Sequence, residues 1–533
     1  MDRPSCNRPA SSIKRVVLIG GGHAHVQVIK ALNAQSRPGN LNVTLIDLQS
    51  SASYSGMVPG CVAGLYALDQ VQIALDSLAD WSGIEFVCGK VVGMSFKESD
   101  GQKSVLVEET DDDGSVVRRE IPFDVVSVDI GSTTRDFTSI PGADRYTIST
   151  RPISDLVRRI QVEDDVIKEK LNTGEVLDSI KVVVVGGGAA GIELSLALRA
   201  RWNDILDSKL SITLIDSNDF LLPSETSACR SALRYVMKKY NIEVRHNLIV
   251  DEVTSSHIHV SSNKNNDKRL EKVPYTHCIW ATGAEAHSLS WDLHKDCGLD
   301  VSPDRGWIRV NHHLQSISHP FVFAAGDCCE ILSDNRKSPP KAGVYAVRSG
   351  PILIENLTRF LGVYPHSKTD GAANSNELIT YQPQDDFLKL LMCGDGTALG
   401  FRFGVPFYGK WVWELKDHID SMFMDLFRVT KFSQSDKTKS NLKTDDKVED
   451  EDAKVNGEVD YDTSQYDRYE AVNERMKAED AGELLLRRDD EVDFQTAWSV
   501  IREMMADEKF KEGVLSTINH SPDAWWKELI TTS

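Results

Sequence analysis

Two glycine-rich turns stand where the sequence passes from a short apolar run into a helical pattern. The first reads Gly20-x-Gly22-x-x-His25 and the second reads Gly186-x-Gly188-x-x-Gly191. The first glycine of such a turn permits a tight bend, and the second lets the backbone approach a pyrophosphate at the positively polarised start of the helix. Both turns therefore predict a binding site for the phosphates of a dinucleotide.

The two turns differ at their third position, which favours glycine or alanine because the helix and strand pack closely there. The second turn has Gly191, whereas the first has His25, which weakens its match. An acid, Asp47 or Asp216, ends the strand that follows each turn, and such a carboxylate accepts hydrogen bonds from ribose hydroxyls. Asp216 also repels a 2′-phosphate, and residues 217–219 include no arginine, so the second turn favours NADH over NADPH.

To position these residues, the chain must form two copies of one unit. Each unit consists of a strand, the glycine turn, a helix and a second strand. Apolar runs at residues 16–19 and 41–47 flank the first turn, and similar runs at 181–185 and 211–216 flank the second. The turns begin 166 residues apart, which is the size of a domain rather than of a structural repeat. Either turn alone has an ordinary loop as its alternative, but two complete units predict an α/β fold with two Rossmann-like dinucleotide-binding domains.

Two further apolar strands end in short polar motifs. Residues 278–284 contain Ala281-Thr282-Gly283, and residues 321–327 end in Gly326-Asp327. Together with the glycine turns, these motifs make the chain resemble the pyridine nucleotide–disulfide oxidoreductase superfamily, whose members are flavoproteins with two dinucleotide-binding domains. Without its neighbours, Asp327 would be interpreted as a turn residue at a strand end.

The resemblance implies that FAD occupies the first turn, that NADH (less readily NADPH) occupies the second, and that Asp327 hydrogen-bonds the FAD ribitol. It also implies that the NAD(P)H-binding domain, residues 151–294, is inserted in an FAD-binding domain made of residues 15–150 and 295–350. The cofactor-binding residues expected on these grounds are Gly20, Gly22, His25, Asp47, Gly186, Gly188, Gly191, Asp216, Gly283, Gly326, Asp327 and Ala342.

Three longer motifs narrow the resemblance. Residues 54–60, 340–348 and 413–420 are similar to type II NADH dehydrogenase-like proteins and to the flavoprotein module that some organisms fuse to selenide, water dikinase. The similarity covers about residues 14–430. No kinase domain follows in this sequence, which argues against a role in selenium chemistry.

The reaction subclass follows from a missing motif. Disulfide reductases of this superfamily carry a C-x4-C redox pair after the second strand, but residues 50–66 contain only Cys61. Hydride that reaches the flavin must therefore leave to an external acceptor, for which we expect a quinone or another small electron acceptor. Two alternatives stay open: a redox-sensing flavoprotein similar to apoptosis-inducing factor that acts through partner binding, and a sulfide–quinone reductase-like enzyme using Cys61 with Cys328.

The resemblance also predicts three catalytic residues, Glu193, Lys341 and Tyr345. Glu193 is expected beside the nicotinamide and flavin, although a solvated helix residue is the alternative. Lys341 and a helix beginning near Ala342 are expected to face the flavin, where a helix N-terminus stabilises the anionic reduced form. Tyr345 and Arg348 are expected near the electron acceptor.

The composition changes after residue 350, and three further segments are expected there. Residues 351–432 predict a small α+β region with an amphipathic helix, residues 433–467 an acidic linker poor in large apolar residues, and residues 468–533 a partly disordered helical tail. Within residues 408–430 one face is expected to rest on a bilayer, with a core-facing helix as the alternative. That face comprises Trp411, Trp413, Phe423, Met424 and Phe427, with Lys410 and Arg428.

Composition sets the outer limits. The 533 residues include 60 basic and 80 acidic side chains, a net charge of −20, which argues against sequence-independent binding of nucleic acid. Nine cysteines without a C-x-x-C pair predict a reducing intracellular compartment, either cytoplasmic or organellar. We expect a disordered lead over residues 1–14, no transmembrane helix and no metal, with His23 and His25 packing or facing phosphate. A homodimer is compatible with these data.

Overall fold

The computed structural model describes residues 13–429 except 97–100, 112, 174–178, 207–208, 263–269, 334–336, 364–376 and 403. The predicted acidic linker at 433–467, the predicted helical tail at 468–533 and residues 1–12 of the predicted lead therefore lie outside the described residues. The first strand begins at Lys14.

A five-stranded parallel sheet carries the first glycine turn. Its strand order is β21-β9-β1-β2-β5, with β1 at the centre. The side chains of Val16 to Ile19 in β1 are buried, as expected for a strand that is covered on both faces. Its strands are β1 (Lys14–Ile19), β2 (Leu41–Asp47), β5 (Glu85–Cys88), β9 (Val125–Val128) and β21 (Val322–Ala324), and α1 (His23–Ala31) packs against α9 (Gly343–Leu361).

A second five-stranded parallel sheet carries the second turn, with the order β11-β18-β12-β13-β14. All its strands lie in sequence between β9 and β21, so this unit is inserted in the first, and the predicted α/β class is confirmed. Its strands are β11 (Ile148–Ser149), β12 (Ile180–Val185), β13 (Leu210–Ile215), β14 (Ile242–Arg245) and β18 (His277–Trp280). Its helices are α4 (Ala143–Tyr146), α5 (Ile153–Asn172), α6 (Ala189–Leu206) and α7 (Ser227–Lys239).

Smaller sheets, most of them antiparallel, join and extend these two units. Thr133 pairs with Glu285 and Thr134 with Ala284, which ties the two crossings between the units together. Three three-stranded antiparallel sheets add β6 (Lys90–Phe96), β7 (Lys103–Thr110) and β8 (Val116–Phe123); β15 (Leu248–Val253), β16 (His257–Ser262) and β17 (Glu271–Pro274); and β23 (Lys389–Met392), β24 (Ala398–Arg402) and β25 (Val405–Gly409). Paired short strands are β3 (Ser51–Ser53) with β4 (Gln72–Ala74), β10 (Thr133–Thr134) with β19 (Ala284–Glu285), and β20 (Ile308–Val310) with β22 (Cys329–Ile331). The remaining helices are α2 (Val58–Ala63), η1 (Asp69–Val71), α3 (Leu75–Ser82), α8 (Ser288–Cys297), η3 (Gly326–Cys328) and α10 (Lys410–Asp425).

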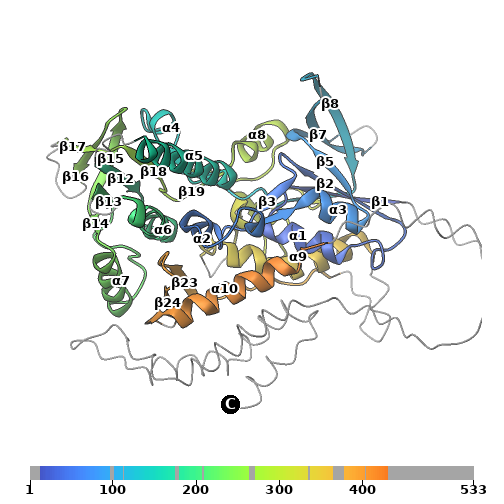
Figure 1. The fold of residues 1–533 in the computed structure, drawn as a ribbon. Helices are drawn as coiled ribbons and strands as arrows, with labels where there is room; N and C mark the ends of the chain where they lie inside the picture. Colours follow the sequence, from blue (N-terminus) through green and yellow to red (C-terminus); the bar gives the residue numbers. More distant parts are fainter. Residues whose placement is uncertain are drawn as a thin grey trace, which may run out of the picture.

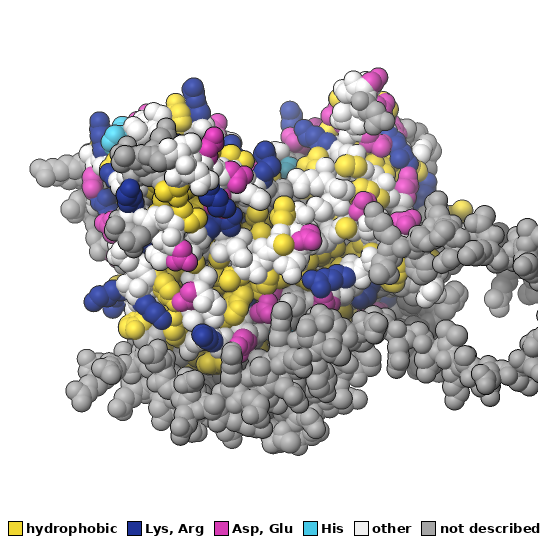
Figure 2. All heavy atoms as spheres, in the orientation of Figure 1, with side chains coloured by type: hydrophobic (Ala, Val, Ile, Leu, Met, Phe, Trp, Pro, Cys, Tyr) yellow, Lys and Arg dark blue, Asp and Glu magenta, His cyan; other side chains and the backbone are white. Residues whose placement is uncertain are grey.

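The two parallel sheets form two separate lobes that lie side by side. Figure 1 shows the second sheet on the left, the first on the right, and α10 extending from β24 toward α1 and α9. On the face seen in Figure 2 the surface is hollowed between the two lobes. Residues from both lobes and from α10 can therefore meet where the two lobes join, a region named the junction.

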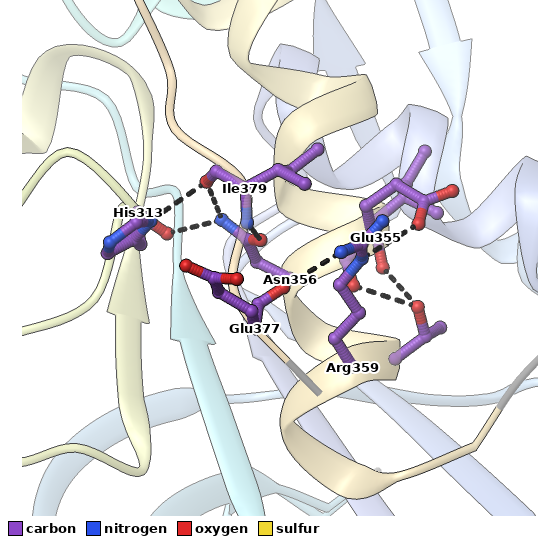
Figure 3. Close-up of polar contacts among 8 residues, drawn as sticks. His313, Glu355, Asn356, Arg359, Glu377 and Ile379 are labelled. Atoms are coloured by element: carbon purple, nitrogen blue, oxygen red, sulfur yellow. Dashed lines mark hydrogen bonds and ion pairs between the residues drawn. The ribbon is translucent and has the colours of Figure 1, made fainter. Parts of the chain in front are cut away.

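The chain returning from α9 to the C-terminal sheet is fastened by one buried side chain. The Asn356 amide donates to the carbonyl oxygens of His313 and Ile379, at 2.8 and 2.9 Å, and accepts from the Ile379 N–H (Figure 3). Arg359 donates to the Glu377 carbonyl beside it. These bonds fix the segment that leads to Tyr381, whose hydroxyl donates to the Tyr345 carbonyl at 3.2 Å.

Candidate functional site

The first glycine turn is closed by a buried histidine. Burial lowers the pKa of His25 to about 4, so its ring is neutral at neutral pH. Nδ1 lies 2.6 Å from the Gly20 carbonyl oxygen and Nε2 lies 2.8 Å from the Ser127 hydroxyl. Nδ1–H therefore donates to Gly20 and the Ser127 hydroxyl donates to Nε2. His25 thus ties the turn to β9.

The second turn has the close packing that its third glycine predicts. A Cβ atom on Gly191 would lie 1.9 Å from the Gly186 carbonyl oxygen, whereas one on Gly188 would meet nothing within 4 Å. Gly188 therefore leaves open space where a phosphate can approach the backbone. Gly186 has φ +115°, a conformation that favours glycine.

The strand-end acids differ in how their oxygens are used. Asp47 accepts hydrogen bonds from the N–H groups of Gly21 at 2.6 Å and Gln49 at 2.9 Å. Asp216 is only 4% exposed, and its Oδ2 has no hydrogen-bond partner among the described residues. A buried carboxylate oxygen without a partner is costly, and a ribose hydroxyl would satisfy it. These residues fit a dinucleotide in each turn.

A third strand-end acid, Asp129, follows β9 and was missed by the sequence analysis. Its Oδ2 accepts from the N–H groups of Ala24 at 2.9 Å and His25 at 3.3 Å, at the start of α1. Burial raises the pKa of its carboxyl to about 7. The acid at the end of an apolar strand, which identified Asp47 and Asp216, was a usable signal for Asp129 as well.

Asp327 is paired with a cation from the other lobe. Its Oδ2 accepts from the Ser132 hydroxyl at 3.2 Å and from Arg151 at 3.4 Å, and Arg151 also donates to Ser132. Gly326 has φ +71°, and a Cβ atom there would lie 2.6 Å from Asp129 Oδ1. Arg151 lies just before α5 in no recognisable motif, so the sequence offered no signal for it.

Four predicted residues, Gly326, Asp327, Lys341 and Tyr345, line one small cavity together with Cys329 and Tyr381. Lys341 donates to the Cys329 carbonyl, and its Nζ lies 4.2 Å from the centre of the Trp307 ring. The helix predicted near Ala342 begins at Gly343, with Ala342 as its N-cap. The amine of Lys341 is thus bound to protein groups beside the helix start.

The start of α9 faces α1 and the loop before α2. A Cβ atom on Gly343 would lie 3.4 Å from Ser55 Oγ and 3.5 Å from His23 Nδ1. The His23 ring lies 5.2 Å from the Tyr54 ring and 5.8 Å from the Phe423 ring. Gly283, which ends the Ala281-Thr282-Gly283 motif, has φ +111° and lies across from Arg135.

Glu193 lies in a separate polar group at the junction. It accepts from the Met392 N–H at 2.9 Å, and desolvation raises the pKa of its carboxyl to about 7, opposed by the charge of Lys416. The Lys416 ammonium donates to Asp420 at 2.9 Å and to the Gly56 carbonyl at 2.8 Å. Asp420 also accepts from the Tyr54 hydroxyl at 3.1 Å. Elements from both lobes and α10 therefore meet around Glu193.

The membrane-facing surface predicted within residues 408–430 is wrong for three of its side chains. Phe423, Met424 and Phe427 are at most 5% exposed and belong to the hydrophobic core. Trp411 stacks on Phe407 and Trp413 packs against Tyr66. The alternative of a core-facing helix holds for the three buried side chains. The Phe423 ring packs on His23 of α1 and on Tyr54, and Lys30 of α1 lies over the Phe427 ring.

Three findings concern the described part of the chain as a whole. Its eight cysteines are free thiols. Its helices are all too short or too polar to cross a bilayer. It contains no group of three His, Cys, Asp or Glu side chains arranged to hold a metal ion.

Comparisons with known proteins agree with this architecture. The sequence profile described as pyridine nucleotide-disulphide oxidoreductase matches residues 14–350. The chain is 22% identical to a probable mitochondrial NADH-ubiquinone oxidoreductase of Schizosaccharomyces pombe, over 64% of this chain and 62% of that protein. It is 23% identical to the type II NADH:quinone oxidoreductase of Haemophilus influenzae, over 62% of this chain and 77% of that protein. The structure of NDH2 from Plasmodium falciparum in complex with NADH superposes with a TM-score of 0.64 at 16% identity, covering 78% of this chain and 97% of that chain.

Proposed function

Because the chain belongs to the pyridine nucleotide-disulphide oxidoreductase family, we propose that it is an FAD-dependent NADH dehydrogenase that reduces a quinone. Relatives named as NADH:quinone oxidoreductases support this activity. The observation that carries the proposal is that the chain has two complete dinucleotide units but only one cysteine, Cys61, in the region where disulfide reductases carry a dithiol. In this proposal residues 15–150 and 295–350 bind FAD and residues 151–294 bind NADH.

FAD, when bound, supplies the two-electron chemistry by accepting hydride from NADH and passing the electrons on. The chain orients the partners and excludes water. Gly20, Gly22 and Asp47 hold the first dinucleotide, and Gly186, Gly188 and Asp216 hold the second. The first residues of α9, beginning at Gly343, have free N–H groups that would stabilise negative charge on a reduced flavin bound beside them.

Quinone reduction also consumes two protons, and Glu193 has the properties of a proton donor. Its pKa of about 7 places it near the ideal value for acid–base work at neutral pH. Lys416 holds a positive charge beside it, since its ammonium is bound to Asp420. We propose that Glu193 Oε delivers a proton to the reduced acceptor and that Lys416 and Asp420 fix its surroundings. Tyr345 and Lys341 keep their proposed roles beside the acceptor and the flavin.

Stopped-flow spectroscopy tests the function. NADH should bleach the yellow flavin of the purified protein within milliseconds to seconds, and a water-soluble quinone should restore the colour at a comparable rate. A protein without flavin absorbance, or a flavin that NADH fails to bleach, would contradict the proposal. Fast bleaching with slow reoxidation by every quinone would favour the redox-sensor alternative, and bleaching by sulfide would favour the sulfide–quinone alternative.

A Glu193→Gln variant tests the proton donor. We expect quinone turnover to fall on the order of 100-fold while flavin content and the NADH half-reaction stay close to wild type. Asp204→Asn is the matched control, since Asp204 is an exposed carboxylate on the same helix. An unchanged quinone rate in Glu193→Gln would assign the proton to another group.

Three broader expectations remain proposals. We propose peripheral membrane contact through residues 408–430, using side chains that are only partly buried, such as Leu415 and Ile419. We also propose a homodimer in a reducing intracellular compartment. Cosedimentation with anionic lipid vesicles should be weakened by Ile419→Ser, and light scattering should give twice the mass of one chain. Equal cosedimentation of wild type and variant would remove α10 from the contact.

A further inference from the structure

The Asp129 carboxyl occupies the start of α1, between two cofactor motifs. Its Oδ2 accepts the N–H groups of Ala24 and His25. A Cβ atom on Gly22 would lie 2.2 Å from its Cγ, and one on Gly326 would lie 2.6 Å from its Oδ1. The side chain is 3% exposed, so the carboxyl is wedged where the first turn offers its free N–H groups to a diphosphate.

The second turn shows what is unusual about this position. A Cβ atom on Gly20 would lie 2.4 Å from the Asp129 carbonyl oxygen, and one on Gly186 would lie 2.2 Å from the Ala281 carbonyl oxygen. Asp129 and Ala281 therefore hold equivalent places beside the two turns, each after a parallel strand. Where the NADH turn has a methyl group, the FAD turn has a carboxyl group.

The groups that face Asp129 leave little positive charge for an arriving diphosphate. From α1, burial lowers the pKa of His23 and lowers that of His25 to about 4, which disfavours a positive charge on either ring. From β2 and η3, Asp47 and Asp327 add negative charge that opposes ionisation of Asp129, and Cys328 is a neutral thiol whose pKa burial raises. The Arg151 guanidinium is paired with Asp327.

We propose that Asp129 binds one proton from solvent when FAD binds at the first turn, so that a neutral carboxylic acid, and not a carboxylate, faces the diphosphate. The proposal rests on the assignment of FAD to this turn. The acid can donate its O–H to a phosphate oxygen, and the N–H groups of Ala24 and His25 are then shared with an uncharged neighbour. Binding and protonation are one balanced step: carboxylate, proton and FAD give the acid and the bound cofactor.

A proton linked to binding makes the affinity depend on pH with a defined sign. The free carboxyl has a pKa of about 7, and bound diphosphate raises it further. Below pH 7 Asp129 is protonated in both states and the FAD affinity is flat. Above pH 7 each further pH unit weakens binding by up to tenfold, which amounts to about 30-fold between pH 6 and pH 8.5.

The experiment measures FAD release from the full-length holoprotein on dilution, followed by flavin fluorescence, between pH 6 and pH 8.5. Wild type should show the loss of about 30-fold in affinity. Asp129→Asn should bind FAD tightly with a flat profile, because the amide carries no charge. Asp124→Asn is the matched control, since Asp124 precedes β9 but pairs with Arg15 at the surface, and it should keep the wild-type slope.

Three outcomes separate the possible failures. A flat wild-type profile, or a slope that persists in Asp129→Asn and disappears in Asp47→Asn, overturns the inference and leaves the proposed function standing. Failure to bind FAD at every pH overturns the proposed function itself. Should Asp129→Asn fail to fold, calorimetry of wild type at pH 8 in two buffers of different ionisation enthalpy decides: uptake of one proton per FAD supports the inference, and no uptake overturns it.

Discussion

The two glycine turns of this chain reach the same backbone shape by different means at their third position. In the second turn, Gly191 lies so close to the Gly186 carbonyl that any side chain would collide with it. In the first turn, the matching Gly20 carbonyl accepts a hydrogen bond from the His25 ring. The difference shows that the third position serves to fasten the helix to the turn, and that contact between backbones and a buried hydrogen bond are alternative solutions.

The largest effect that can break this comparison is expected from Gly191→Ala. The added Cβ would lie 1.9 Å from the Gly186 carbonyl oxygen, so the helix start must move away from the turn at a cost of about 3 kcal/mol. We expect the NADH affinity to fall roughly 100-fold, measured as the NADH dependence of flavin bleaching, with FAD retained.

Gly188→Ala separates packing from cofactor approach in the same turn. Its Cβ would meet no protein atom within 4 Å, so the free energy of unfolding should stay near wild type while NADH binding weakens. Equal unfolding free energies for the two alanine variants would show that the third glycine is not a packing requirement.

The next largest effect is expected from His25→Ala in the first turn. The change opens a cavity and leaves the Gly20 carbonyl and the Ser127 hydroxyl buried without a partner, which we expect to cost about 3 kcal/mol of unfolding free energy. Urea denaturation of the two proteins measures it. His259→Ala is a suitable control, since His259 of β16 pairs with the exposed Glu252 of β15. A loss no larger than the control's would mean that His25 does not fasten the turn.

The pH dependence of stability sharpens the same point with a smaller effect. His25 has a folded-state pKa of about 4, below the ordinary value near 6.5, so its protonation favours the unfolded chain. The stability that the neutral ring contributes is fully present above pH 6.5 and is lost as the pH falls toward 4. The loss is about 2 kcal/mol at pH 5. The difference in unfolding free energy between wild type and His25→Gln, measured at pH 7.5 and pH 5, should shrink by this amount. A constant difference would show that His25 is not buried in its neutral form.

The sequence predicted the elements of both turns because each rests on local periodicity and glycine spacing. The insertion of the second unit in the first was expected from the resemblance to the family and not from local periodicity. Arg151, Lys416 and Asp420 were not predicted as site residues. Arg151 matches no short motif, and the motif at 413–420 that contains Lys416 and Asp420 indicates a family resemblance but not which of its side chains reach the site. Asp129 was within reach, since the rule that identified Asp47 and Asp216 applies to it, but no glycine turn precedes its strand.

The sequence left two alternatives open for the apolar face of α10, for a physical reason. Hydrophobic periodicity locates an apolar stripe on a helix but does not tell whether protein or lipid covers it. Phe423, Met424 and Phe427 pack in the core, and the same helix presents Lys416 and Asp420 to the junction, both buried. A stripe that contains a buried ion pair is better explained by a protein neighbour than by a bilayer, because an ion pair requires polar partners.

The smallest effect concerns the two acids that follow the turns. Asp216 Oδ2 has no hydrogen-bond partner within the described part of the chain, whereas Asp47 is bound by two backbone N–H groups. Asp216 is therefore the carboxylate left available to discriminate between nucleotides. Arg245, whose carbonyl accepts the Asp216 N–H, has its guanidinium engaged by Glu271 at 2.6 Å and does not offset the charge of Asp216. Asp216→Asn should therefore shift the ratio of NADPH to NADH affinities by about tenfold toward NADPH, measured by flavin bleaching with each nucleotide. Asp47→Asn should leave that ratio unchanged, because its charge lies beside the other dinucleotide. A shift in Asp47→Asn equal to that in Asp216→Asn would mean that the two turns do not bind different nucleotides. That result would contradict the assignment of FAD to the first turn and NADH to the second.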